Sequence, residues 1–98
     1  MQKVCLTKVT PAEAEQYYHV SQWEEYNTMG PAIEKWKLDP PELRQEAIYI
    51  QKGAVTVSCM GIQYHLQPGH LMTIDTGVEF YWIVEDFVEA VWQFDTEI

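Results

Sequence analysis

Hydrophobic and polar residues alternate through the second half of the chain in runs of strand length. Each break between runs carries Gly, Pro or an acidic pair. Because successive side chains of a strand point to opposite faces, this pattern predicts five or six short strands separated by tight turns. The runs between Glu46 and Phe94 are EAIYIQKG, AVTVSCMG, IQYHLQPG, HLMTIDTG, EFYWIV and FVEAVWQF. Short strands at this spacing predict an all-β fold, a small antiparallel β-barrel or jelly roll.

The first third of the chain carries a helix signal between two further patterns. Residues 4–9, VCLTKV, alternate and are typical of an opening strand. Thr10-Pro11-Ala12-Glu13 combines a capping Thr, a Pro at the first helical position and a Glu that closes a capping box, so we expect a helix from here to about His19. We expect a loop or short turn over residues 21–30, and a strand over residues 32–38, AIEKWKL.

Length and composition fit one domain with one modest core. The chain has 98 residues, of which 47% are hydrophobic, and this is enough to fill one modest core. We expect one domain over 1–98, with a strand and helix arm over 1–30 and the barrel over 31–98. Four Trp, six Tyr and three Phe are many for this size. They suit a narrow barrel whose lumen is filled or shaped by large side chains.

The charge of the chain narrows the class of partner. A formal net charge of −9 argues against binding nucleic acid, which needs basic residues to neutralise phosphates. It argues equally against anionic membrane surfaces. A net charge of this size is typical of a protein whose charged surface keeps it soluble.

The two cysteines, Cys5 and Cys59, are far apart in the sequence and match no zinc motif. Free thiols fit a reducing compartment. The first residues have no apolar segment of signal-peptide type, and no apolar run approaches membrane-spanning length. We therefore expect a cytoplasmic protein.

Strand periodicity predicts which side chains share a face. An apolar lumen with a carboxylate at its rim follows, and a lone buried carboxylate is costly unless it is paired or protonated. The hydrogen-bond donors expected for Glu46 are Tyr49, Tyr64, a Trp N–H or water. The three predicted inward faces are Glu46, Ile48 and Ile50; Ile62, Tyr64 and Leu66; and Phe80, Trp82 and Val84.

These residues also carry a resemblance. The chain resembles a small single-domain cupin, of the compact type related to ureidoglycine aminohydrolase and the ethanolamine-utilisation cupins. The resemblance implies a cupin-type antiparallel β-barrel with a short N-terminal helix, and cupins bind a metal in the lumen through histidines and a Glu. It is carried over most of the chain by the Thr10-Pro11 opening, Trp23, Trp36, Glu46-x6-Gly53, Gln67-Pro68-Gly69, Gly77 and Trp82.

The metal-binding residues of the family are largely missing. The His-x-His pair of the first cupin motif falls on Asp39-Pro40-Pro41-Glu42, and the metal-binding His of the second motif falls on Phe80. Three of the four ligands that the resemblance implies are therefore absent, and only Glu46 is kept. The three histidines, His19, His65 and His70, have no ligand-like spacing. We expect no metal and no other cofactor.

Three functions stay open, and no catalytic residue is identified. In the first, the barrel binds a small organic ligand without a metal, in an aromatic-lined pocket. In the second, it is a metal-dependent enzyme with an unusual ligand set that includes Glu46. In the third, it is a homodimeric interaction or assembly module, with Trp23 and Trp92 at the interface. The predicted ligand-binding residues of the lumen are Glu46, Ile48, Tyr64, Phe80 and Trp82.

Overall fold

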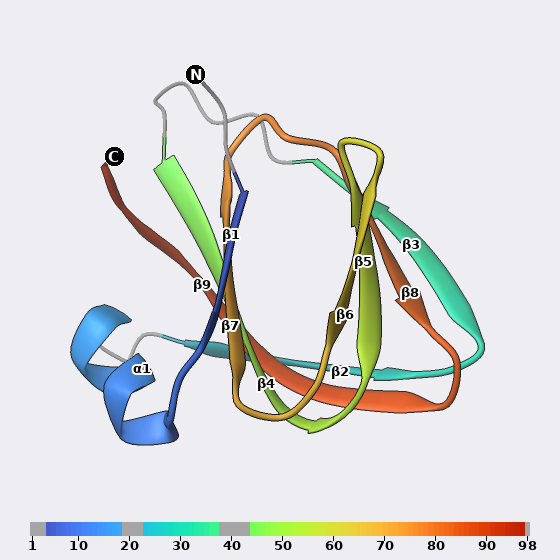
Figure 1. Ribbon diagram of the computed structural model, residues 1–98, viewed down its shortest axis with the longest axis horizontal. Helices are drawn as coiled ribbons and strands as arrows, with labels where there is room; N and C mark the ends of the chain where they lie inside the picture. Colours follow the sequence, from blue (N-terminus) through green and yellow to red (C-terminus); the bar gives the residue numbers. More distant parts are fainter. Residues whose placement is uncertain (1–3, 19–22, 38–43, 98) are drawn as a thin grey trace.

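The computed structural model describes residues 4–18, 23–37 and 44–97, and these form two antiparallel sheets packed face to face (Figure 1). One sheet has five strands in the order β1-β7-β4-β9-β2, and the other has four in the order β3-β8-β5-β6. The elements are β1 (Val4–Lys8), α1 (Pro11–Tyr18), β2 (Glu24–Met29), β3 (Ala32–Trp36), β4 (Arg44–Gly53), β5 (Val55–Cys59), β6 (Ile62–Leu66), β7 (His70–Asp75), β8 (Phe80–Val84) and β9 (Phe87–Glu97). The predicted all-β jelly roll with one short N-terminal helix is confirmed.

The helix begins where the sequence predicts. The backbone N–H of Glu13 donates to Thr10 Oγ1 at 3.2 Å, and the N–H of Thr10 donates to Glu13 Oε1 at 3.2 Å. This reciprocal pair satisfies backbone donors that the first turn leaves free. The predicted end of the helix, near His19, lies outside the described residues. No helix in the described part of the chain is long and apolar enough to cross a membrane.

The prediction of a loop over residues 21–30 is wrong. Strand β2 occupies most of this segment and pairs with β9 along its whole length, from Glu24 opposite Trp92 to Met29 opposite Phe87. Its inward positions are Tyr26 and Thr28, between exposed Glu and Asn residues that are poor strand formers. A long partner strand stabilises the extended backbone here, and this pairing is not visible in the local sequence.

The buried hydrophobic residues form two clusters. The main core lies between the two sheets, and a second, smaller cluster lies under the helix. Strand β4 contributes to both, so residues 46–50 are buried without a break. The core between the sheets contains Ile48, Ile50, Val55, Val57, Cys59, Leu66, Met72, Ile74, Val78, Phe80, Trp82, Val84, Val88 and Ala90. The second cluster, on the outer face of the five-stranded sheet, contains Val9, Ala14, Ala47, Tyr49, Leu71 and Val91, with Trp23 packed against it.

The two sheets are connected differently at their two sides. On one side the chain passes directly from β2 into β3, so the outer strand of one sheet leads into the outer strand of the other. On the other side the outer strands are β1 and β6, and among the described residues no ladder pairs them. This side of the barrel is a seam between two strand edges.

Inward-facing residues at this seam remain exposed. Leu6 pairs with buried Met72 and therefore faces inward, yet it is 39% exposed. Ile62 pairs with buried Cys59 and is 53% exposed. The seam between β1 and β6 thus carries exposed apolar side chains, Leu6 and Ile62, on the inward faces of its two strands.

Candidate functional site

The five predicted lumen residues converge on the space between the sheets. Ile48, Phe80 and Trp82 are fully buried members of the main core, and half-buried Tyr64 packs against it. Glu46 lies two residues before Ile48 on the same face of β4 and is also buried. His65, which follows Tyr64, is exposed as its strand parity predicts. The predicted role of these residues in binding a ligand stays a prediction.

Glu46 has an unusual environment for a carboxylate. It pairs with Ile74 of β7 and Phe94 of β9, and only 2% of its surface is exposed. Among the described residues its Oε1 atom has no hydrogen-bond partner. Burial raises the pKa of the Glu46 carboxyl from 4.5 to about 7, because a charged carboxylate loses its hydration here. Near neutral pH the side chain is therefore divided between its acid and its anion.

One detail of this carboxylate differs from the sequence prediction, although Glu46 is buried as that prediction assumed. Tyr49, one of its expected donors, points to the opposite face of β4 and packs in the cluster under the helix. An odd separation along a strand puts two side chains on opposite faces, so this pairing was not available.

Four aromatic rings form a continuous cluster inside the barrel. The rings of Trp36 and Trp82 are stacked, with centroids 5.4 Å apart and an interplanar angle of 19°. Tyr26 meets Trp36 edge-on at 4.8 Å, and Phe80 lies 5.5 Å from Trp36. The aromatic cluster of Tyr26, Trp36, Phe80 and Trp82 joins strands β2, β3 and β8, so it spans the side where one sheet passes into the other.

The polar groups beside this cluster satisfy one another. The hydroxyl of Tyr26 donates to the carboxylate of Glu34, with 2.6 Å to Oε2. The indole N–H of Trp82 donates to Thr28 Oγ1 at 3.1 Å. Burial, and then the neighbouring Glu34, raise the pKa of Tyr26 to about 12, so its hydroxyl stays protonated. Glu34 is therefore a second inward carboxylate, and it accepts a hydrogen bond from Tyr26, whereas Oε1 of Glu46 has no partner within the described part of the chain.

Sequence reasoning missed Tyr26, Thr28 and Glu34 as interior residues. Tyr26 and Thr28 were missed because a loop was predicted over residues 21–30, and a loop has no regular inward face. The signal for Glu34 was present, because the predicted strand over 32–38 already placed it on the same face as Trp36.

The described residues do not fit a cupin-type metal. They contain no group of three His, Cys, Asp or Glu side chains that could hold an ion. Phe80 fills the position of one expected His and is buried in the core. Cys59 is a poor substitute ligand, because burial raises the pKa of its thiol and the thiolate is the form that binds metals. The positions of the expected His-x-His pair, 39–42, lie outside the described residues and carry no histidine.

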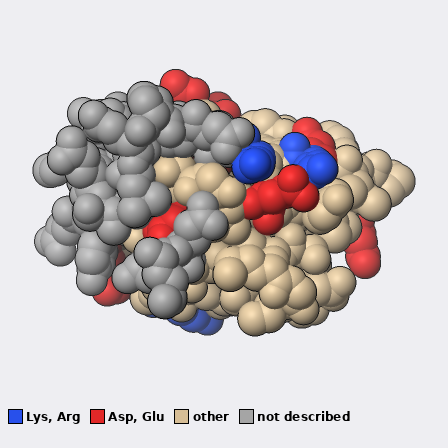
Figure 2. Space-filling view, turned by 90° about the horizontal axis from the view of Figure 1, so that it is seen from above, with Lys and Arg blue, Asp and Glu red and all other residues tan. Residues whose placement is uncertain are grey.

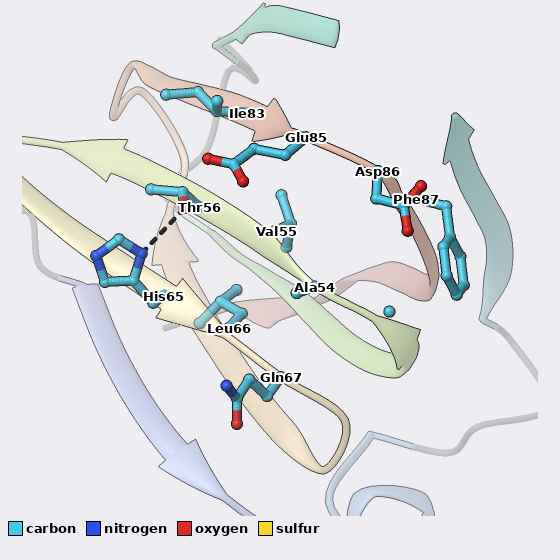
Figure 3. Close-up of a pocket in the computed structure, with 11 residues that line it drawn as sticks. Ala54, Val55, Thr56, His65, Leu66, Gln67, Ile83, Glu85, Asp86 and Phe87 are labelled. Carbon is cyan, nitrogen blue, oxygen red and sulfur yellow. Dashed lines mark hydrogen bonds between the residues drawn. The ribbon is translucent and has the colours of Figure 1, made fainter. Parts of the chain in front are cut away.

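A separate pocket of about 420 Å³ lies on the outer side of the four-stranded sheet (Figure 3). Thr56 Oγ1 and His65 Nδ1 are 3.0 Å apart in it, and Glu85 and Asp86 lie on the side formed by the end of β8. It contains none of the five predicted lumen residues. Most of its polar side chains are exposed, whereas Glu46 is buried and its Oε1 has no partner among the residues that the structure describes. The pocket is lined by Gly53, Ala54, Val55, Thr56, His65, Leu66, Gln67, Ile83, Glu85, Asp86 and Phe87.

Solved structures similar to this chain share its architecture. A DUF861-family protein from Thermotoga maritima superimposes with a TM-score of 0.74 at 25% identity, covering 93% of this chain and 98% of that one. The Clostridium difficile EutQ protein gives a TM-score of 0.61 at 16% identity, covering 96% of this chain and 68% of that one. The Cupin_2 domain of an XRE-family transcriptional regulator from Enterobacter cloacae gives 0.64 at 8% identity, covering 97% and 98%.

Comparison of the sequence, in contrast to comparison of the structure, identifies no relative. The chain matches no protein-family model and none of the curated proteins. The likeness is therefore carried by the arrangement of strands, which the three solved structures share despite low identity.

Proposed function

We propose that this chain, which has the fold of a small cupin, binds a small organic ligand between its two sheets without a metal. The observation that carries the proposal is Glu46, whose Oε1 is buried with no partner among the described residues. A buried polar atom that lacks a partner is destabilising, and a ligand that bonds to it removes this cost in the bound state. Ligand pockets are commonly apolar with a few polar groups of this kind.

The interior is lined by groups that suit such a ligand. The aromatic cluster offers ring faces and edges for packing, with stacking and edge-on contacts that favour flat molecules. Tyr26, Glu34, Trp36 and Tyr64 all face inward and are only half-buried. These four side chains are therefore partly in contact with solvent, and we propose the seam between β1 and β6, with its exposed Leu6 and Ile62, as the route by which a small molecule enters.

The proposal is tested by screening small planar molecules against isotopically labelled protein. Binding inside the barrel is expected to move the indole N–H signals of Trp36 and Trp82 in NMR spectra. Trp23 packs in the cluster under the helix, so its signal serves as the internal control. Molecules that move only the Trp23 signal, or surface signals, would contradict an interior site.

The metal-free part of the proposal has its own measurement. Untagged protein is expected to carry no stoichiometric metal by mass spectrometry, and divalent ions are expected to leave its melting temperature unchanged. A bound metal, or a melting shift that Glu46→Ala abolishes, would favour the metal-dependent enzyme instead.

A homodimer is a second candidate, favoured by an exposed apolar surface. Ile33 is 70% exposed on the outer face of β3, and it pairs with Ile83 of β8. Trp23 and Trp92, the predicted interface residues, instead pack against the two clusters of their own chain. We propose the outer face of β3 and β8 as the dimer surface. Light scattering should then give a dimer mass for the native chain and a monomer mass for Ile33→Glu.

A further inference from the structure

We propose that the interior ligand is a small organic cation, an ammonium group on an apolar or aromatic body, whose N–H donates to Glu46 Oε1. This inference rests on the proposed function and specifies the chemistry of the ligand. Its first support is geometric. Glu46 shares the inward face of β4 with Ile48 and Ile50, and Oε1 is buried without a partner among the described residues. In its ionised form a carboxylate oxygen only accepts, so the group that bonds to the Glu46 anion must be a donor.

The inward donors Tyr26 and Trp82 do not donate to Glu46 within the protein. Tyr26 already donates to Glu34, and Trp82 already donates to Thr28. Both donors are used within the protein, and on the inward face of β4 the buried Oε1 of Glu46 has no partner among the described residues.

The charge of the interior favours a cation over an anion. The lysines whose side chains are described, Lys8, Lys35, Lys37 and Lys52, are all exposed. His70 accepts a hydrogen bond from the backbone N–H of Gln67 at its own turn, 2.9 Å from Nδ1. An anionic ligand would find no described cation facing it and would meet the carboxylates of Glu34 and Glu46. A cation meets the same two groups as attraction.

The aromatic cluster adds a second attraction. The negative face of an aromatic ring attracts a cation, and the effect is largest for Trp and when the cation is desolvated. Half-buried Trp36, stacked on the fully buried Trp82, and half-buried Tyr26 give the interior this character. The apolar body of the same ligand packs on rings that the cation does not use.

The surface of the protein supports approach by a cation. The net charge is −9, and such a field raises the local concentration of cations. At the end of the molecule shown in Figure 2, Lys and Arg side chains lie on the outside next to Asp and Glu. Lys35 Nζ and Glu79 Oε2, 3.4 Å apart, form an exposed ion pair.

Three probes of matched shape test this inference: benzylamine as cation, benzyl alcohol as neutral donor and benzoate as anion. Binding is followed by the Trp36 and Trp82 indole signals and by calorimetry at millimolar probe. We expect benzylamine to bind about tenfold or more tightly than benzoate, because one charge-assisted hydrogen bond accounts for at least that factor. Glu46→Gln should remove most of this preference while leaving benzyl alcohol within about twofold.

The control variant is Glu79→Gln, which removes the same charge from an exposed carboxylate and is expected to change none of the three affinities. The native protein gives a second readout that needs no variant. With ¹³C-labelled Glu, the Glu46 carboxyl signal should move toward the ionised form on adding benzylamine and stay in place with benzyl alcohol.

The outcomes separate the two proposals. Tighter binding of benzoate or benzyl alcohol, with the same indole signals moving, would overturn the cation and leave the interior site standing. A benzylamine preference that persists in Glu46→Gln would overturn the assignment to Glu46. If no probe moves the interior signals, both the cation and the interior ligand site are contradicted.

Discussion

The indole N–H of Trp82 donates to the hydroxyl of Thr28 at 3.1 Å, and this hydrogen bond joins β8 of one sheet to β2 of the other. Trp82 is fully buried, so water cannot replace the acceptor. The bond also fixes the indole ring that stacks on Trp36. One hydroxyl therefore serves both the contact between the sheets and the aromatic cluster.

Thr28→Val is expected to lower the free energy of unfolding by about 1–3 kcal/mol. It keeps the branched shape but leaves the buried N–H of Trp82 without an acceptor. Chemical denaturation followed by Trp fluorescence measures the change. Thr28→Ser keeps an acceptor hydroxyl and serves as the conservative control. Asn27→Ala alters the exposed neighbouring residue, so its free energy of unfolding should stay within about 0.5 kcal/mol of that of the native protein. Equal effects of Thr28→Val and Asn27→Ala would mean that the bond contributes nothing.

Glu46→Gln is expected to stabilise the protein at high pH. The folded pKa of about 7 lies above the ordinary value of 4.5, so the folded chain binds the proton more tightly than the unfolded chain. Stability contributed by the protonated group is therefore full below pH 4.5 and is lost as pH rises through 7. The free-energy difference between Glu46→Gln and the native protein should shift in favour of Gln by on the order of 3 kcal/mol across this window.

Denaturation of both proteins at several pH values measures that difference, since the other carboxylates titrate equally in the two. Glu79→Gln, at an exposed site, is the matched control and should give a flat difference. If the difference in unfolding free energy between Glu46→Gln and the native protein is also independent of pH, the Glu46 carboxyl is hydrogen-bonded to a protein group or to water.

Phe80→Ala is expected to cost about 3–5 kcal/mol, because it leaves a cavity in a core that cannot close fully. Phe80 is buried between the sheets and contacts the ring of Trp36. The control is Tyr81→Ala, since Tyr81 is exposed on the opposite face of the same strand and should cost far less. A register shifted by one residue would reverse the order of the two variants. Thermal and urea unfolding distinguish these outcomes.

Gly53→Ala should be much more destabilising than Gly61→Ala. Both glycines have positive φ, 76° and 79°, so both variants carry the strain of about 1 kcal/mol that an L-residue meets there. At Gly53 a Cβ would also lie 2.2 Å from the carbonyl oxygen of Phe87, whereas at Gly61 nothing lies within 4 Å. The difference in unfolding free energy between the two variants isolates the backbone clash. Similar values would mean that the β4–β5 turn moves away from β9 at no cost.

The parts of the fold that could be predicted depend on local chemistry. The capping box at Thr10 and Glu13 specifies the start of the helix, and the alternation of Val55, Val57 and Cys59 appears unchanged in the buried face of β5. Turn glycines such as Gly53 mark strand ends because the chain needs positive φ there. Each of these signals lies within a few residues, so no knowledge of the partner strand was needed.

The parts that could not be predicted depend on partners distant in sequence. Strand β2 is extended because β9 pairs with it, with Glu24 opposite Trp92. Continuous burial in β4 arises because the helix covers one face and the other sheet covers the second. In the candidate site, strand parity placed Glu46, Phe80 and Trp82 inside, but the Tyr26–Glu34 bond required β2 to exist first.

Burial of β4 on both faces divides the barrel into regions that differ in their freedom to evolve. A change of size at any position from Ala47 to Ile50 disturbs a cluster on one side or the other, so this part of the strand is constrained by the fold. Tyr26, Glu34, Trp36 and Tyr64 lie on outer strands and are only half-buried. A descendant of this protein can exchange those four side chains for a new ligand while the central strand keeps the scaffold intact.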